Sequence, residues 1–206
     1  MIRHRVLTII GLLIVLVFVQ NLTAQKQESL DSDQIKFTLP KDFEKVEKAG
    51  LDFRFYTHKP EKTGCCLDEN IYAYSNKNKP VEVMLTFIAS DEIKGTENGV
   101  RENSLPGIKL EIEKLADQKV KDIKWLKKEI IVQNKKKWIH LIFQTPKTDD
   151  DRFYEFLMAD YHGYLMVFGT SSDAPEYNKN KTLMTKIINS LKVDEAIYEA
   201  PAMPGK

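Results

Sequence analysis

The sequence predicts an α+β domain, a three-layer α/β/α sandwich in which two amphipathic helices cover an antiparallel sheet. Residues 105–122 and 173–191 carry apolar side chains at helical spacing. The turns between the strands of 127–170 are so short that neighbouring strands must run antiparallel. Apolar residues of this meander fall on both faces of the strands, so both faces need a cover.

The composition is that of an ordinary globular chain. Its 206 residues include 31 Lys+Arg and 30 Asp+Glu, and 42% are hydrophobic. These values exclude collagen, long disorder and a multi-span membrane protein. A nearly neutral chain also has no general field for nucleic acid, so we expect no nucleic-acid partner.

The first 24 residues have the pattern of a secretory signal peptide. A basic start at 3–5 precedes the apolar run Val6–Val19, and small or polar residues lead to Ala24. The run is shorter than the ~20 residues that span a bilayer. We therefore expect an exported, periplasmic or extracellular protein, cleaved after Ala24. If the segment stays uncleaved it is a membrane anchor, and the domain still lies outside the cytoplasm.

The mature chain divides into three parts. Residues 25–34 are polar and are expected to be a disordered linker. Residues 35–193 form a single α/β domain. Residues 194–206 contain two prolines and a glycine and are expected to be a flexible tail.

Strands and helices are expected in a definite order within the domain. In the strand 81–89, alternate residues starting at Val81 face one way, and Met84 and Ile88 face the other. Ser104 is the expected N-cap of the first helix. Ser172 or Asp173 is expected to cap the second. The expected strands are 35–39, 51–57, 71–75, 81–89, 127–133, 138–145, 152–161 and 164–170.

This order of elements resembles the PsbP-like fold family. The residues that carry the resemblance are Phe37-Thr38-Leu39-Pro40 with Phe43, the helix of 105–122, Trp138, Tyr161-His162-Gly163-Tyr164, Glu176-Tyr177 and Asn189-Ser190-Leu191. The family includes an extrinsic subunit of photosystem II, a Ran-binding release factor and small bacterial envelope proteins. The resemblance implies the α/β/α sandwich and no shared catalytic residues. A secreted chain with a bacterial signal fits neither the nuclear GTPase nor the photosystem role.

The adjacent pair Cys65-Cys66 holds the only cysteines of the chain. Neighbouring Cα atoms lie about 3.8 Å apart, whereas disulfides prefer about 4.4–6.8 Å, so a vicinal disulfide is strained. Three interpretations remain open: packed thiols, a strained or intermolecular disulfide, and a soft-metal site. For the metal site His58 is a further candidate ligand, with Asp68 and Glu69 nearby. Without a metal-spaced second Cys/His pair, the leading expectation is no cofactor.

Motifs for catalysis are missing from the sequence. It has no G-x-S-x-G, Walker A or H-E-x-x-H pattern. Three consecutive aspartates at 149–151 diverge and fit a hairpin turn better than a calcium loop. His140 alternates with strand residues and is expected to be packed in the core, and His162 lies in a turn. We therefore predict that the protein is not an enzyme, and a hydrolase with a spatially assembled site is the third alternative.

Trp125 is the candidate binding residue. It follows the apolar stripe of the first helix, and an exposed Trp at that place is suited to anchor a partner. The leading hypothesis is a non-catalytic binding or accessory domain of the cell envelope. Its partner is a protein or another envelope component that the sequence does not identify. The competing hypothesis is a thiol-redox or soft-metal protein that uses Cys65 and Cys66.

Overall fold

The computed structural model describes residues 25–30, 34–46, 72–76, 79–90, 93, 96, 99–145 and 151–194. The expected signal peptide at 1–24, the expected strand at 51–57, the cysteine pair and the tail from 195 onward lie outside these residues. Within the described ranges, no helix combines the length and hydrophobicity that a membrane crossing needs.

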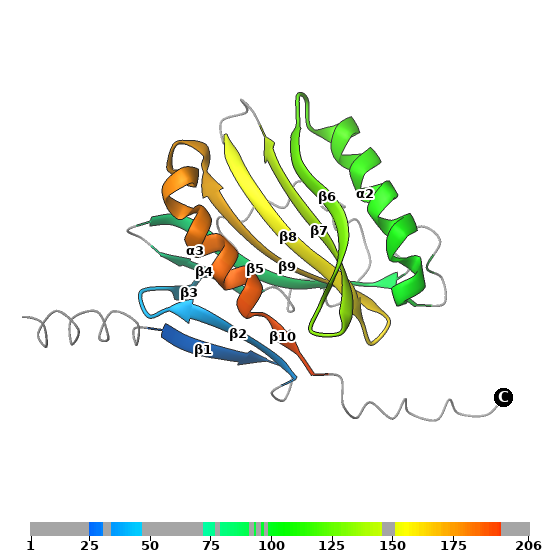
Figure 1. The fold of residues 1–206 in the computed structure, drawn as a ribbon, viewed down its shortest axis with the longest axis horizontal. Helices are drawn as coiled ribbons and strands as arrows, with labels where there is room; N and C mark the ends of the chain where they lie inside the picture. Colours follow the sequence, from blue (N-terminus) through cyan, green and yellow to red (C-terminus); the bar gives the residue numbers. More distant parts are fainter. Residues whose placement is uncertain are drawn as a thin grey trace, which may run out of the picture.

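An antiparallel sheet dominates the fold (Figure 1). In the described part of the chain it has seven strands in the order β3-β4-β5-β9-β8-β7-β6. Every neighbouring pair runs antiparallel, so the predicted antiparallel sheet is confirmed. The strands are β3 (Glu44–Val46), β4 (Tyr72–Asn76), β5 (Lys79–Ile88), β6 (Lys124–Gln133), β7 (Lys136–Thr145), β8 (Arg152–Tyr161) and β9 (Tyr164–Asp173).

Two hairpins of this sheet turn on two-residue loops. Asn134 and Lys135 join β6 to β7 with φ of 52° and 65°. His162 and Gly163 join β8 to β9 with φ of 50° and 86°. Two successive positive φ values define the type I′ turn, whose twist matches that of paired strands. The second turn lies where the sequence predicts it, whereas the first is shorter than the predicted 134–137, because Lys136 and Lys137 already belong to β7.

The first helix, α2 (Leu105–Lys119), begins as predicted after Ser104, with Pro106 in its first turn. Ser104 does not cap α2 through its side chain. Its hydroxyl instead donates to the Arg101 carbonyl at 2.6 Å, within a 3-10 turn that precedes the helix.

The second helix, α3 (Tyr177–Ser190), begins later than the sequence predicts. Ser172 and Asp173 are not its caps, because β9 continues to pair with β8 as far as Arg152 opposite Asp173. Both residues therefore belong to β9 and not to the start of α3. A 3-10 turn, Ala174–Glu176, then leads into the helix.

Buried apolar side chains lie on both faces of the large sheet, as the sequence predicts. On β5, Val81, Val83 and Leu85 join one buried cluster with α3, and Met84 and Ile88 join a second cluster with α2. The α3 side chains in the first cluster are Tyr177, Met184, Ile187 and Ile188. The α2 side chains in the second are Leu105, Ile108 and Ile112. The fold is therefore an α+β arrangement of two helices and a large antiparallel sheet.

A small second sheet was not predicted. Within the described residues it consists of β1 (Gln25–Leu30), β2 (Ile35–Pro40) and β10 (Lys192–Val193), in the order β1-β2-β10. The expected disordered linker at 25–34 is therefore wrong for Gln25–Leu30. These polar residues pair along their whole length with β2. The pairing satisfies backbone N–H and C=O groups, and amino-acid composition gives no sign of it.

The small sheet adds to the core beneath α3. The side chains of Ile35, Phe37 and Leu39 are buried in the α3 cluster. The ring of Phe37 lies 5.0 Å from that of Phe168 on β9 and meets Tyr74 of β4 edge-on. Figure 1 shows the small sheet beside α3, with β10 leaving the end of that helix.

Gly169 on β9 offers a test of how tightly the α2 side is packed. A Cβ at this position would lie 2.2 Å from two ring atoms of Phe156, its partner on β8. Gly169→Ala is expected to destabilise the fold by about 1–3 kcal/mol, because the ring must leave its place. Urea unfolding of the purified domain measures the change.

Gly107 in α2 is the matched control. A Cβ there meets no atom within 4 Å. Gly107→Ala is expected to raise stability by about 0.5–1 kcal/mol, since alanine loses less backbone entropy in a helix. Equal unfolding midpoints for the two variants would contradict the tight packing of Phe156 against Gly169.

Candidate functional site

Trp125 lies where the end of α2 meets the edge strand β6. Its ring is half-buried and stands against the Phe143 ring, with the centroids 5.2 Å apart. Its Nε1 donates to Asp117 Oδ1 at 2.8 Å. The Nζ of Lys128 lies 5.3 Å from the centre of the ring. Contacts from both α2 and β7 therefore fix the orientation of a ring that keeps an exposed side.

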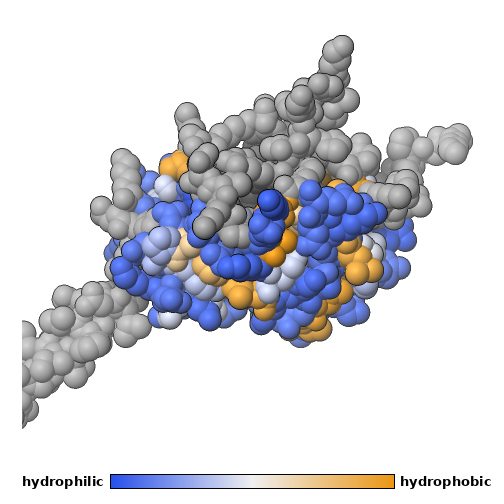
Figure 2. Space-filling model, turned by 90° about the horizontal axis from the view of Figure 1, so that it is seen from above, coloured by the Kyte–Doolittle hydropathy of each residue, from blue (hydrophilic) through white to orange (hydrophobic). Residues whose placement is uncertain are grey.

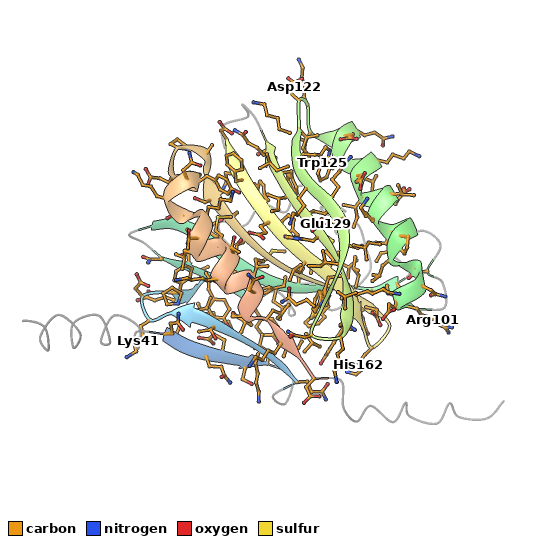
Figure 3. The ribbon with its side chains drawn as sticks, in the orientation of Figure 1. Lys41, Arg101, Asp122, Trp125, Glu129 and His162 are labelled. Atoms are coloured by element: carbon orange, nitrogen blue, oxygen red, sulfur yellow. The ribbon has the colours of Figure 1, made fainter. Side chains whose placement is uncertain are left out.

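The sequence predicts Trp125 just past the helix, and the chain path explains why it belongs to a strand. Val120 is already extended, with φ −115° and ψ 108°. Asp122 then takes a positive φ of 61° and turns the chain back toward the sheet. Strand β6 begins at Lys124, so Trp125 pairs with Phe143 in the ladder. Figure 3 labels Asp122 at the turn before β6 and Trp125 on that strand.

An ion-pair network ties α2 to β6 next to Trp125. The Glu113 carboxylate on α2 accepts from Lys109 on the same helix, and its Oε2 lies 3.1 Å from the Nζ of Lys128. Partial burial by itself would raise the pKa of Glu113. The hydrogen bonds and charges of the two lysines outweigh that effect and hold the pKa below its usual range.

Apolar and cationic side chains share the exposed surface of β6. Leu126, Ile130 and Val132 are exposed by 57%, 37% and 69% of their surface. Leu126 occupies a bulge between Trp125 and Lys127. The lysines of 124–128 are exposed among them, on the last strand of the large sheet in the described part of the chain. A similar mixture of apolar and hydrophilic groups covers the described surface seen from above (Figure 2).

A buried pair, His140 on β7 and Glu155 on β8, was only half foreseen. His140 is buried, as expected, and its Nε2 lies 3.0 Å from Glu155 Oε1. Its Nδ1 lies 3.6 Å from Glu129 Oε1 on β6. The sequence carried a signal for the pair, because Glu155 occupies an inward position between Phe153 and Leu157, and a buried carboxylate needs a partner.

The other face of the sheet carries an ion pair between two half-buried side chains. Arg152 Nη2 lies 3.0 Å from Glu82 Oε2, and Ser171 donates to the same oxygen at 3.3 Å. Burial raises the pKa of Glu82, and the guanidinium of Arg152 opposes that rise. These contacts cross β8, β9 and β5, so the pair stabilises the sheet.

His162 has a structural role at the β8–β9 turn. Its Nε2 lies 3.2 Å from Gln34 Oε1, and the hydroxyl of Tyr161 donates to the same oxygen at 3.1 Å. The Gly163 carbonyl accepts from the Val100 amide at 2.8 Å. The hairpin is thereby fastened to two other parts of the chain.

Cys65, Cys66 and His58, the predicted metal ligands, lie outside the described residues, as do Asp68 and Glu69. Among the residues that are described, no group of three or more His, Cys, Asp or Glu side chains is placed to hold a metal ion. The structure therefore leaves the cysteine hypothesis as a prediction.

Comparison with known proteins identifies the fold. No family model and no curated sequence matches the chain. The solution structure of cyanobacterial PsbP (CyanoP) from Synechocystis sp. PCC 6803 matches with a TM-score of 0.51 at 16% identity, over 82% of this chain and 92% of that one. The chain therefore has a PsbP-like fold, as its sequence suggested.

Two further structures match with lower scores. The Ran-binding protein Mog1p of Saccharomyces cerevisiae matches at TM-score 0.48 and 10% identity, over 82% of this chain and 95% of that one. LpqN of Mycobacterium tuberculosis, involved in cell envelope biogenesis, matches at 0.46 and 9%, over 82% and 90%.

Removing the His140 side chain is expected to lower the stability of the fold, because the buried Glu155 carboxylate loses its partner. His140→Ala leaves Glu155 without its partner, which should destabilise the fold by about 3–5 kcal/mol. Glu155→Gln in the same background should restore most of that loss, because the orphaned charge is gone. Urea unfolding of the two single variants and the double variant measures the coupling, and strictly additive losses would contradict it.

The Glu113 network predicts a specific response to acid. Because the folded-state pKa is depressed, its stabilising contribution is complete above the unfolded-state pKa of about 4.3. The contribution is lost as the pH falls from there through the lower folded-state value. Glu113→Gln should therefore show a shallower loss of stability over this acidic range. Parallel urea titrations at several pH values measure the slopes, and identical slopes would count against the network.

Proposed function

We propose that this chain is an exported, non-catalytic binding protein of the cell envelope, which holds a protein partner at the surface of β6. The observation that carries this proposal is Trp125, half-buried and oriented by Phe143 and Asp117, beside exposed apolar side chains of the same strand. A large ring that is already ordered loses little entropy on binding, which is the property of an interface anchor.

The described histidines support a binding role over a catalytic one. The His140 side chain is hydrogen-bonded to Glu155, and the His162 side chain is hydrogen-bonded to Gln34 at a turn. Each therefore has a structural use. We also infer that the two helices and the sheet between their clusters make the three-layer α/β/α sandwich expected from the sequence.

The described strands are compatible with the proposed cleavage. The described part of β1 starts at Gln25, so cleavage after Ala24 removes none of the described strands. N-terminal sequencing of the protein recovered from outside the cytoplasm is expected to start at Gln25, and recovery of uncleaved protein in the cytoplasm would contradict export.

Site-specific cross-linking in the native host tests the binding surface. A photoreactive residue at Leu126 is expected to capture a discrete envelope protein. The same residue at Tyr164, which is 49% exposed on another strand, is the matched control and should not capture it. Trp125→Ala is expected to weaken the captured complex by about 2 kcal/mol or more, the cost of a lost anchor. Equal capture from both positions would refute the surface.

The cysteine pair supports one alternative, a thiol-redox or soft-metal protein that uses Cys65 and Cys66 with His58. The adjacency of the only two cysteines in an exported chain is the observation behind it. Thiol titration and elemental analysis of the purified mature protein separate the two functions. Reactive thiols or bound copper or zinc would favour the alternative, and two unreactive thiols without metal would eliminate it.

A further inference from the structure

We infer that β6 binds an extended, acidic and apolar segment of its partner as an added antiparallel strand. The inference rests on the proposed function and specifies the chemistry of the partner. Among the described residues β6 is the last strand of the large sheet and pairs with β7 alone.

The turn that ends β6 determines which of its backbone groups point outward. The type I′ loop Asn134–Lys135 makes Gln133 and Lys136 a hydrogen-bonded pair. Bonded and non-bonded pairs alternate along an antiparallel ladder, so Val132, Ile130 and Lys128 belong to non-bonded pairs. Their N–H and C=O groups therefore point away from β7. These three residues offer an incoming strand a row of donors and acceptors.

The side chains of the same residues provide apolar contacts for that strand. Ile130 and Val132 lie on the α2 side of the sheet and are 37% and 69% exposed. Residues of an added strand directly opposite them would sit about 4.5–5.5 Å away, Cβ to Cβ. A β-branched residue at each place would bury apolar surface that is now in water.

Lysines along β6 and its hairpin determine the charge of the partner. Lys127 pairs with Glu129, Lys128 shares Glu113 with Lys109, and Lys124 is exposed. The hairpin adds Lys135, which is exposed, whereas the Nζ of Lys136 lies 3.3 Å from Asp160 Oδ1 and the Nζ of Lys137 lies 2.9 Å from Glu102 Oε1. The lysines outnumber the carboxylates they meet, so an acidic strand gains from opposite charge pairs. Edge lysines also disfavour pairing between two copies of the same strand.

A short peptide tests the inference directly. The probe is acetyl-Thr-Val-Thr-Val-Thr-Glu-Glu-amide, written to lie antiparallel from Gln133 to Lys127. Two-dimensional amide NMR of the mature protein is expected to show downfield shifts at Ile130 and Val132, whose N–H groups gain acceptors. The Ile131 amide already lies in the ladder and should move less. A control peptide with lysine in place of both glutamates should bind at least about tenfold more weakly.

Variants of β6 separate strand addition from charge attraction. Val132→Pro removes an outward N–H without breaking the ladder and should abolish binding, while Val132→Thr should retain it. Lys127→Glu should weaken binding by about tenfold and reduce its salt dependence. Lys186→Glu, the same charge change on exposed α3 surface, is the control and should have no effect. Circular dichroism verifies that each variant is folded.

Four outcomes would overturn the inference. The first is uniform shifts of the β6 amides on peptide addition. The second is shifts that depend on protein concentration without peptide, which would indicate a second copy at the edge. The third is that the protein binds phosphatidylglycerol vesicles and not the peptide, with vesicle binding lost in Lys127→Glu and kept in Val132→Pro. The fourth is capture of the envelope partner at Leu126 that survives Val132→Pro, which leaves the proposed function intact. Absence of any captured partner would instead refute the proposed function.

Discussion

The fold depends on central strands that are apolar on both faces. Leu157 of β8 is buried in the α3 cluster, whereas its neighbours Phe156 and Met158 are buried in the α2 cluster. Neither face tolerates water, so each face needs a cover, and side chains of α3 join the first cluster while side chains of α2 join the second. The small sheet serves the same requirement, because its inward side chains extend the cover on the α3 side.

Among the described residues, one buried and one half-buried carboxylate each have a basic partner. Glu155 is accompanied by His140 beneath α3, and Glu82 by Arg152 on the opposite face. His140 and Glu155 lie on the hydrogen-bonded neighbours β7 and β8, whereas Glu82 on β5 and Arg152 on β8 meet across β9. The strand order of the sheet therefore brings the partners together. The cost of leaving either carboxylate alone makes these contacts selective for the observed strand order.

The buried clusters on the two faces of the large sheet leave the backbone edge of β6 uncovered within the described residues. Helix α2 is joined to β6 through Glu113 and Trp125, and both contacts lie on the face of the sheet. The outward backbone of Lys128, Ile130 and Val132 is left for another strand. Edge lysines and the Leu126 bulge limit indiscriminate pairing there. The same arrangement makes the edge selective for a segment of opposite charge.

Local pattern determined the antiparallel meander, both helical stripes, the tight turn at His162-Gly163 and the two-sided strand β5, because alternation and turn residues are visible in neighbouring positions. It also identified Trp125 and placed His140 inside. Only the tertiary structure decided that polar residues 25–30 form β1, since their gain is backbone pairing with β2, which polar side chains do not signal. It likewise decided that Ser172 and Asp173 stay in β9, that Glu155 meets His140, and that β6 pairs with β7 alone among the described residues. These outcomes depend on which strands pair, and the pattern within a single segment does not encode that pairing.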